Sequence, residues 1–458
     1  MNLFSDRLSL KELKILNYLF FSICFLGIVI FPSCSKKLDI SPPSEVKSLS
    51  DYPNILLIIA DDMGLDYTPG YSVGIKKPLM PNLTKLQSEG ITYDNVWSTP
   101  ICAPTRASII TGKYGIHNGV LNTSNAGTLS ESEKTLQAYL DEKLGKVYTH
   151  AIIGKWHLSN QEPNRPNKMG IDYFAGLIPG TLSDYHNWDL TINGQTSKSS
   201  DYITTKLTDL AINWIKTQDK PWFCWLAYTA PHSPFHLPSS EMHSQIELSS
   251  SQSDIDANPS PYYIAMIESI DFEMGRLFNS IPSDQKDNTV VIFLSDNGTP
   301  GKVIQAPYES NRSKGSLHQG GIHVPMIIGG PLVSRKGERE QSLISTTDLF
   351  STIAELAGVD ESKRFNSKSF YSTFSNSSNL ERTYNYSEIL DMDRPAKSGF
   401  TIRNERYKLI VLENNSYRFY DLINDPYEKI NLMNANLSDE LEKIKNMLIF
   451  ESSNLRKK

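Results

Sequence analysis

The sequence predicts an α/β protein, in which a large, mostly parallel β-sheet is sandwiched by helices and followed by a smaller α+β subdomain. Short, near-continuous apolar runs each end abruptly in polar residues, and the stretches between them are long enough for helical crossovers. One such stretch, 262–281, carries apolar residues at helical spacing. After about residue 344 the pattern changes to β-prone pieces and amphipathic helices. We therefore expect a main domain over 52–343 and a subdomain over 344–458.

Four apolar runs fit strands that are buried on both faces of a parallel sheet: 54–60, 150–153, 222–228 and 290–294. Ligands bind at the carboxyl ends of such strands, so the polar residues that follow the runs are expected to converge. These residues are Asp61, Asp62, Lys155, His157, His232, Asp296 and Asn297. A single Asp pair is equally well explained as a helix cap or a turn. Four coincident strand ends predict a functional site.

The C-terminal subdomain is predicted from local signals. Residues 346–358 have the pattern of an amphipathic helix, and 437–449 have that of a second. Between them, 407–411 and 417–420 are β-prone and flank Asn414 and Asn415, which predicts a hairpin.

Composition excludes some classes of function. The 458 residues are 39% hydrophobic and 21% charged, which suits a protein with a sizeable core. A formal net charge of -6 gives no sequence-wide basic field. Nucleic acid is therefore not an expected partner.

The N-terminus has the features of an export signal. Arg7, Lys11 and Lys14 precede an apolar run over 16–31. The run ends at 31–37, which resembles the processing box of bacterial lipoproteins with Cys34 as the lipidated residue. We expect a signal peptide over 1–33, a linker over 34–51, and an exported bacterial protein held by lipid at the cell envelope, facing the periplasm or on the cell surface. An uncleaved membrane anchor and ordinary signal cleavage remain alternatives.

Two of the four cysteines remain for the folded body, because Cys24 lies in the signal and Cys34 would carry lipid. No disulfide framework is expected. Cys224 lies in an apolar run and is expected to be buried and inert. Cys102 lies just before Pro104, which can open a helix, and this position suggests a reactive thiolate with Arg106 as its partner. A cysteine that only packs is an equally good explanation of this segment alone.

Several motifs resemble those of the formylglycine-dependent sulfatases. Residues 102–106 fit the family's Cys-x-Pro-x-Arg maturation core, and 154–158 match its second motif, Gly-Lys-Trp-His-Leu. The resemblance also includes Thr111-Gly112-Lys113, Asp61-Asp62, Asp296-Asn297-Gly298, Pro231-His232-Ser233-Pro234, Lys314-Gly315 and the closing segment 420–432. It spans roughly residues 53–432 and implies an alkaline-phosphatase-like fold.

The resemblance implies that Asp61, Asp62, Asp296 and Asn297 bind a metal ion together with the formylglycine made from Cys102 by a maturation enzyme. Ligands that are all oxygen favour calcium, with magnesium second, and offer zinc little. The implied mechanism is attack of the hydrated formylglycine on sulfur, a covalent sulfo-enzyme, and elimination of sulfate. Arg106 and Lys155 would support the diol, His157 would take its proton, and His232 with Lys314 would bind sulfate and protonate the leaving oxygen.

The chain departs from the family at Gln319 and His323, where Glu and Arg are common. Because of these changes, the resemblance does not predict the charge around Lys314. His186 and Trp188 suit either a substrate pocket or an ordinary loop, and are not counted in the site.

The rival functions are a phosphate or phosphonate ester hydrolase of the same superfamily and a non-catalytic lipoprotein that binds sulfated glycan. The first class typically has His after the late Asp, whereas this chain has Asn297. The joint presence of the six candidate catalytic residues argues against the second. We expect a sulfatase that acts on exported or extracellular sulfated polysaccharide or oligosaccharide.

Overall fold

The computed structural model describes residues 48–123, 128–359, 363–376, 380 and 382–457. The predicted signal peptide, Cys34 and most of the predicted linker lie outside these residues and stay predictions. None of the helices in the described part of the chain has both the length and the apolar character needed to cross a membrane.

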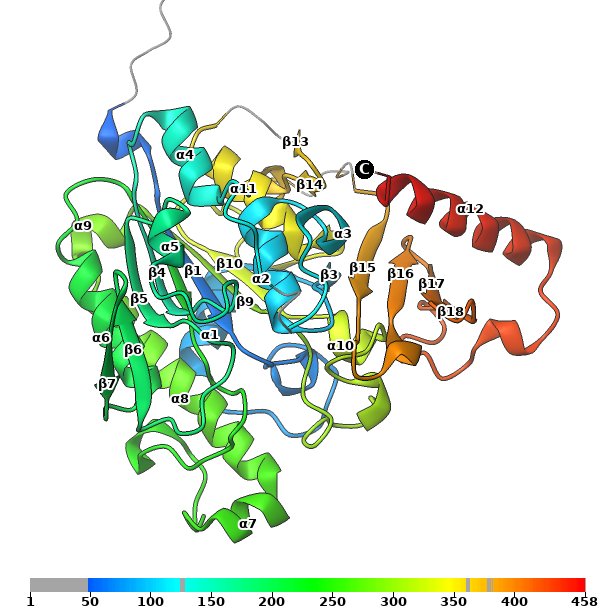
Figure 1. The fold of residues 1–458 in the computed structure, drawn as a ribbon, viewed down its shortest axis with the longest axis horizontal. Helices are drawn as coiled ribbons and strands as arrows, with labels where there is room; N and C mark the ends of the chain where they lie inside the picture. Colours follow the sequence, from blue (N-terminus) through cyan, green and yellow to red (C-terminus); the bar gives the residue numbers. More distant parts are fainter. Residues whose placement is uncertain (1–47, 124–127, 360–362, 377–379, 381, 458) are drawn as a thin grey trace, which may run out of the picture. The chain divides into compact units, whose positions relative to one another are not determined.

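The main domain is built on a ten-stranded sheet, as predicted (Figure 1). The strand order is β11-β2-β10-β9-β1-β8-β4-β5-β6-β7. The strands are β1 (Asn54–Ala60), β2 (Gly90–Tyr93), β4 (Thr149–Lys155), β5 (Tyr173–Leu177), β6 (Trp188–Ile192), β7 (Gln195–Ser199), β8 (Trp222–Ala227), β9 (Thr289–Ser295), β10 (Met326–Gly329) and β11 (Glu338–Glu340). Strands β9, β1, β8, β4 and β5 run parallel, whereas β10, β6 and the edge strand β7 introduce antiparallel pairs. All four predicted apolar runs are central strands.

Alternation along β1 divides the core into two layers. Ile55, Leu57 and Ile59 face one layer of helices, and Leu56 with Ile58 faces the other. The first layer contains α2 (Cys102–Thr111), α4 (Leu136–Leu144) and α11 (Leu349–Leu356), and the second contains α1 (Pro81–Glu89), α6 (Ile203–Ile215) and α8 (Pro259–Ser280). The predicted crossover helix over 262–281 is α8. Burial of both sheet faces explains why β8 and residues 55–60 of β1 are apolar.

Shorter elements connect these layers. They are α3 (Gly115–Asn118), α5 (Arg165–Lys168), α7 (Gln252–Ala257), α9 (Ser283–Lys286), α10 (Gln319–Ile322), the pair β3 (Val96–Trp97) with β12 (Ile344–Ser345), and the pair β13 (Lys363–Arg364) with β14 (Ser367–Lys368).

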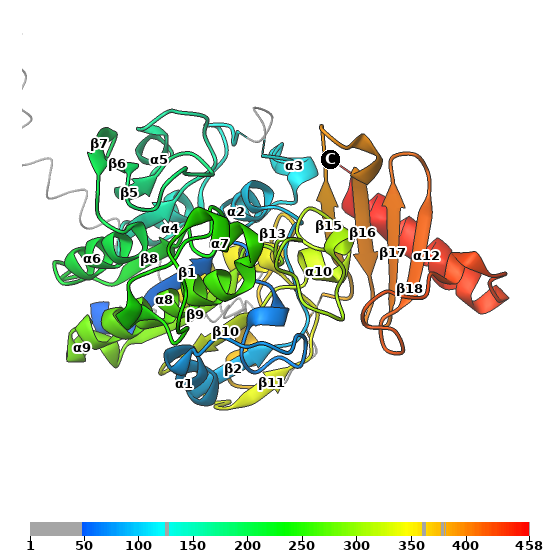
Figure 2. The same cartoon turned by 90° about the horizontal axis from the view of Figure 1, so that it is seen from below.

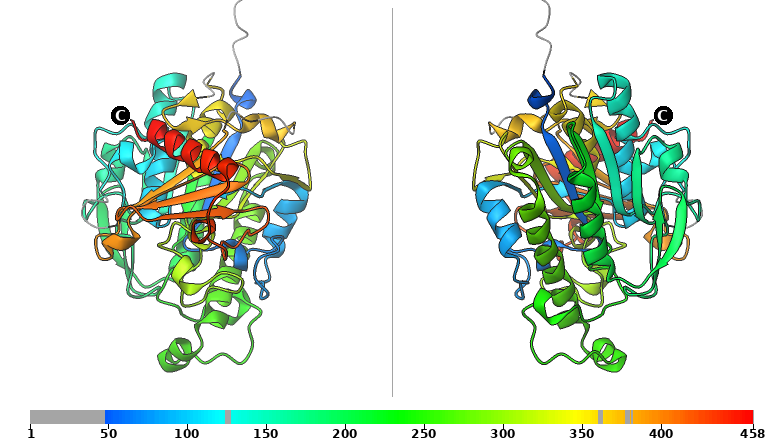
Figure 3. Two further views of the ribbon diagram at one scale, coloured as in Figure 1. Left: turned by 90° about the vertical axis from the view of Figure 1, so that its right-hand side faces the viewer. Right: turned by 90° about the vertical axis from the view of Figure 1, so that its left-hand side faces the viewer.

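The C-terminal part forms a second, antiparallel sheet with a long helix against it. Its strands are β15 (Asn385–Ile389), β16 (Gly399–Arg403), β17 (Tyr407–Leu412) and β18 (Tyr417–Asp421), and α12 (Asp439–Leu455) lies across one face (Figures 2 and 3). Strands β17 and β18 form the predicted hairpin, in which Asn415 adopts a left-handed conformation with φ 60°. The α+β subdomain is thus confirmed. The predicted division at 343/344 stays a prediction, and α11 packs in the core of the large sheet.

A buried ionic junction joins the second sheet to the main domain. Glu428 Oε1 forms an ion pair with Lys408 Nζ at 2.7 Å, and its Oε2 lies 3.2 Å from His318 Nδ1. Glu428 Oε2 also accepts from the backbone N of Gln319 at 2.6 Å. Burial raises the pKa of Glu428, but Lys408 and His318 outweigh it and hold the pKa at about 2. Because this pKa lies below the ordinary value, the junction stabilises the fold above about pH 4.5 and loses this contribution as the pH falls toward 2.

We predict that Glu428→Gln lowers the free energy of unfolding by about 3 kcal/mol or more at pH 7, because Lys408 is left buried without a counter-ion. Urea denaturation measures the change. The matched control is Glu413→Gln, which changes an exposed residue in the turn between β17 and β18. The difference between the variant and the wild type should shrink on acidification below about pH 4. An equal loss in both variants would contradict the junction's role.

Candidate active site

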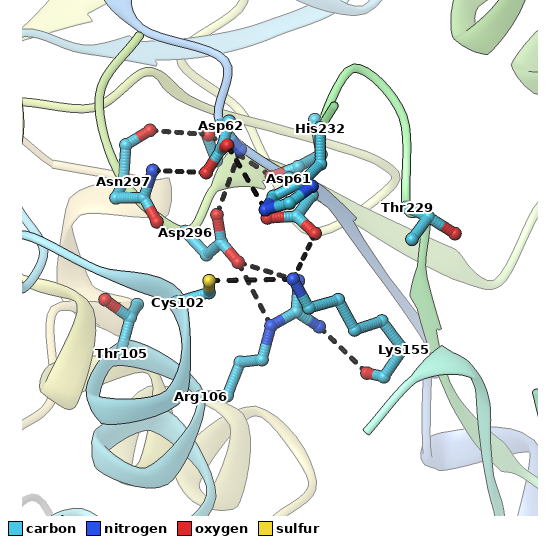
Figure 4. Close-up of polar contacts among 12 residues, drawn as sticks. Asp61, Asp62, Cys102, Thr105, Arg106, Lys155, Thr229, His232, Asp296 and Asn297 are labelled. Carbon is cyan, nitrogen blue, oxygen red and sulfur yellow. Dashed lines mark hydrogen bonds and ion pairs between the residues drawn. The ribbon is translucent and has the colours of Figure 1, made fainter. Parts of the chain in front are cut away.

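The carboxyl ends of four parallel strands deliver the predicted side chains to one place (Figure 4). Asp61 and Asp62 follow β1, Lys155 ends β4, and Asp296 with Asn297 follows β9. His232 lies in the loop after β8, and Lys314 comes from the loop before α10. Cys102 and Arg106 are provided by α2. The structure therefore brings together the residues that the sequence predicted for the site.

Two buried ion pairs hold the inner part of the site. Lys155 Nζ contacts Asp61 Oδ2 at 2.5 Å and donates to Cys102 Sγ at 3.5 Å. Arg106 donates to Asp296 Oδ2 from Nε at 3.0 Å and from Nη2 at 2.7 Å. Its Nη1 donates to the carbonyl of Lys155 at 2.9 Å, which ties α2 to the end of β4. These side chains are at most 1% exposed. Such pairs are stable in the interior only because each charge has its partner in place.

A third ion pair, between Asp62 and Lys314, lies on the more open side of the site. Lys314 Nζ donates to Asp62 Oδ2 at 2.5 Å, and His232 Nε2 lies 3.7 Å from the same oxygen. Asn297 Nδ2 donates to Asp62 Oδ1 at 2.7 Å. Burial raises the pKa of Asp62, but Lys314 and then His232 outweigh it, so the pKa lies below its usual value. Lys314 keeps 20% of its side chain exposed, so the site meets solvent beside it.

Cys102 is the first residue of α2 and is 3% exposed. Burial raises the pKa of its thiol above the ordinary value, although Lys155 and Lys314 oppose this. Arg106 donates to Asp296 and to a carbonyl. Burial therefore disfavours a thiolate at Cys102, and the hydrogen bonds of Arg106 go to other groups. Lys155 is the cation beside the sulfur.

The two histidines differ in their surroundings. His232 Nδ1 donates to the carbonyl of Ser233 at 2.7 Å, which leaves its Nε2 facing Asp62 Oδ2. His157 has a buried Nδ1 without a hydrogen-bond partner. Burial lowers the pKa of His157 well below its usual value, and Lys155 adds to the effect. A neutral His157 can accept a proton.

Backbone constraints hold the ends of the strands. Asp62 has φ 75° and His157 has φ 58°, both in the left-handed region that non-glycine residues rarely adopt. Gly154, with φ 111°, lies where an added Cβ would be 1.9 Å from the carbonyl oxygen of Ala227. The glycine of the 154–158 motif is thus required by the close approach of β4 and β8.

The loop between β5 and β6 positions both histidines, and the sequence analysis missed it. A Cβ on Gly180 would lie 2.0 Å from His157 Nε2, so only glycine leaves room for the ring. The Tyr185 hydroxyl contacts the carbonyl of Thr229 at 3.0 Å and that of His232 at 2.6 Å. Neither residue belongs to a recognisable motif. A lone Gly and a lone Tyr in a loop carry no signal from which the sequence predicts these contacts.

Residues outside the main motifs are also placed. Trp188 is buried in the core and donates to the carbonyl of Asp201 at 3.0 Å, so it does not line a pocket. His186 stacks on Tyr202. Gln319 accepts from Trp97 Nε1 at 3.0 Å and lies 3.5 Å from His323 Nδ1. The two departures from the family pattern thus lie at the junction with the second sheet.

The site's oxygen atoms fit a hard cation. Asp61 Oδ1 and Asn297 Oδ1 are buried and accept no hydrogen bond, which is costly unless something else binds them. Ligand atoms of Asp61, Asp296 and Cys102 lie within 4.8 Å of one another. Carboxylate and amide oxygens are the ligands that Ca²⁺ and Mg²⁺ prefer. The residues present therefore fit a divalent metal.

Comparison with known proteins agrees with this geometry. The model of the Sulfatase family matches residues 53–359, and that of the N-sulphoglucosamine sulphohydrolase C-terminal region matches 312–457. Arylsulfatase J of Mus musculus is 29% identical over 70% of this chain, which spans only 56% of that relative. The uncharacterized sulfatase YdeN of Escherichia coli is 26% identical over 84% of this chain and 82% of its own length.

Solved structures share the fold. Ps i-CgsB in complex with k-i-k-neocarrahexaose has a TM-score of 0.74 at 25% identity, covering 88% of this chain and 93% of its own. The phosphonate monoester hydrolase of Agrobacterium radiobacter has a TM-score of 0.66 at 19% identity, covering 88% of this chain and 95% of its own. The fold alone therefore does not separate the two chemistries.

Fold and site together place the chain in the alkaline-phosphatase-like class, with a cluster suited to a divalent metal. Within that class the matching family model covers most of the chain. The chain belongs to the sulfatase family, whose members are sulfuric ester hydrolases and are known to use a formylglycine and a divalent metal.

We predict that Gly180→Ala lowers kcat about a hundredfold by displacing the His157 ring, with a smaller effect on KM. The exposed Thr181→Ala in the same loop is the matched control and should retain wild-type rates. Thermal unfolding of both variants shows whether the loop still folds. Wild-type kcat in a folded Gly180→Ala protein would refute the positioning role of Gly180.

Proposed function

We propose that this sulfatase releases sulfate from sulfated polysaccharides or oligosaccharides, using a formylglycine made from Cys102 and a calcium ion. The observation that carries the proposal is the oxygen-only cluster around Cys102, in which three carboxylates and Asn297 lie beside two lysines and an arginine. Three carboxylates meet three cations, so the cluster is neutral. A bound divalent cation makes it net positive, which suits a sulfate ester anion.

A formylglycine at position 102 supplies the nucleophile, and a bound calcium ion supplies Lewis-acid stabilisation of a sulfate oxygen. Asp61, Asp62, Asp296 and Asn297 would hold the ion. The unpartnered Asp61 Oδ1 and Asn297 Oδ1 support this assignment.

The chain's own residues orient and move protons. Lys155 lies 3.5 Å from the reactive position and holds it beside Asp61, while Arg106 fixes Asp296. His157, with a lowered pKa and an unpartnered Nδ1, would accept the proton at position 102. Lys314 and His232 stand on the solvent side, where they bind the sulfate oxygens and protonate the leaving alcohol.

A glycan substrate is consistent with the predicted location at the cell envelope. The signal-like segment over 16–31 and Cys34 favour a lipid-anchored, exported enzyme that meets sulfated glycan outside the cytoplasm. Ps i-CgsB, which shares the fold, carries k-i-k-neocarrahexaose in its complex.

The rival is hydrolysis of phosphate or phosphonate esters. Asn297 argues against it, because an amide oxygen in place of an imidazole suits calcium and gives zinc less.

We predict that the peptide containing Cys102, from protein made with its maturation enzyme, is lighter than the unmodified peptide by one sulfur and two hydrogens less one oxygen. Intact-peptide mass spectrometry checks this, and the peptide containing Cys224 is the internal control. The same preparation should release sulfate from sulfated sugars, and Cys102→Ala should not. Phosphate release without sulfate release, or full activity of an unmodified Cys102, would contradict the proposal.

We predict that chelation lowers the thermal stability and abolishes sulfate release, and that calcium restores both better than magnesium. A ligand at a hundredfold excess over its Kd stabilises the folded state by about 2.7 kcal/mol. In Asn297→Ala the response to calcium should be weaker, because one oxygen ligand is lost. The exposed Asn279→Ala, at the end of α8, is the control. Calorimetry that shows no calcium-dependent shift in the matured wild type would remove calcium from the proposal.

A further inference from the structure

A small cationic cavity lies beside the site and has no role in the chemistry described above. It has a volume of about 170 Å³, several times what one water molecule needs. Its walls come from the loop that carries Lys314 and from the second sheet. Leu317 and Ile410 form part of its apolar wall. Arg312, Lys397 and Arg418 are its charged residues, and no carboxylate lines it.

The positive charges of this cavity are only weakly compensated. Lys397 has no ion pair within the described part of the chain. Arg418 Nη1 lies 2.9 Å from His318 Nε2, and burial lowers the pKa of His318, so Arg418 is held by a neutral ring. Arg312 donates to the backbone carbonyl of Glu428 at 2.5 Å, and its ion pair with the half-exposed Glu309 is 3.6 Å long. An arginine has five donors, so both guanidiniums keep donors for a ligand.

The cavity is a direct neighbour of the reactive centre. Arg312 and Ser316, two residues on either side of Lys314, both line it, and two residues of chain span at most about 7 Å. Gly315 N donates to the carbonyl of Pro100 at 2.9 Å, two residues before Cys102. Lys314 is also where the site meets solvent. A substrate that enters there brings its neighbouring sugar toward the cavity.

We propose that this cavity binds a second anionic group of the glycan, on a ring next to the one that loses sulfate. Lys397 and Arg418 are the specificity-determining residues, and they select for substrates that carry further negative charge. The ligand chemistry is an anionic oxygen group, either a second sulfate ester or the carboxylate of a uronic acid. The inference rests on the proposed sulfatase function.

The test uses matured enzyme and three disaccharides with the same scissile sulfate ester, whose second ring is neutral, sulfated or a uronic acid. Lys397→Ala and Arg418→Gln should each lower kcat/KM about tenfold for the sulfated or the uronic acid substrate, or for both. For the neutral substrate and for 4-nitrophenyl sulfate, kcat/KM should change by about twofold or less. The response of the sulfated and the uronic acid arms identifies which anion is bound.

Lys216→Ala, at the exposed end of α6, removes the same charge at a remote site and is the matched control. An equal fall in kcat/KM for all substrates, or no fall for either anionic substrate, would overturn the proposed role of the cavity. Sulfate release by the wild type would be unaffected by that outcome, so the proposed function would stand. If the wild type releases no sulfate from the disaccharides or from 4-nitrophenyl sulfate, the proposed function itself fails. In that case calorimetry still tests the cavity. It compares the binding of the disulfated disaccharide to Cys102→Ala protein with its binding to the same protein that also carries Lys397→Ala.

Discussion

Three carboxylate–cation pairs, two of them fully buried, are the constraint on which this structure depends. Asp61 with Lys155, Asp296 with Arg106, and Asp62 with Lys314 bring six charges to one place where water is largely excluded. Removing any one of them strands its partner in the interior, at a cost of about 3–5 kcal/mol for such a pair. The six charges come from five segments of the chain, because Asp61 and Asp62 are neighbours after β1. The site therefore exists only when the parallel sheet, α2 and the loop before α10 are all assembled.

The sheet satisfies this constraint through its topology. Parallel strands end at the same edge, so residues far apart in the chain meet without long connections. The backbone also helps to orient the side chains of the site. Asp62 and His157 adopt left-handed conformations, and Gly154 allows close contact between β4 and β8. Strain of this kind persists because the surrounding hydrogen bonds hold it, such as the one from the Asp62 amide to Asp296 Oδ1 at 3.2 Å.

The second sheet completes the site from outside. Its junction at Glu428 fixes the loop on which Lys314 lies, and Gln319 is part of that junction through its backbone N. The side chains that depart from the family pattern, Gln319 and His323, contact Trp97 and the carbonyl of Asp94 beside this junction. Arg418 of this sheet lines the cationic cavity, as does Lys397, which lies just before β16. The second sheet therefore serves both stability and the proposed selection of substrate.

The sequence by itself determined the large sheet, its central strands, the hairpin, and the residues that gather at the site. It could do so because buried parallel strands are continuous apolar runs and because the motif residues are local in sequence. Only the tertiary structure decided the partners: that Lys155, rather than Arg106, donates to Cys102, and that Gly180 and Tyr185 position the histidines. Such contacts join segments dozens of residues apart, and a pattern of residue types along the chain records only neighbours in sequence.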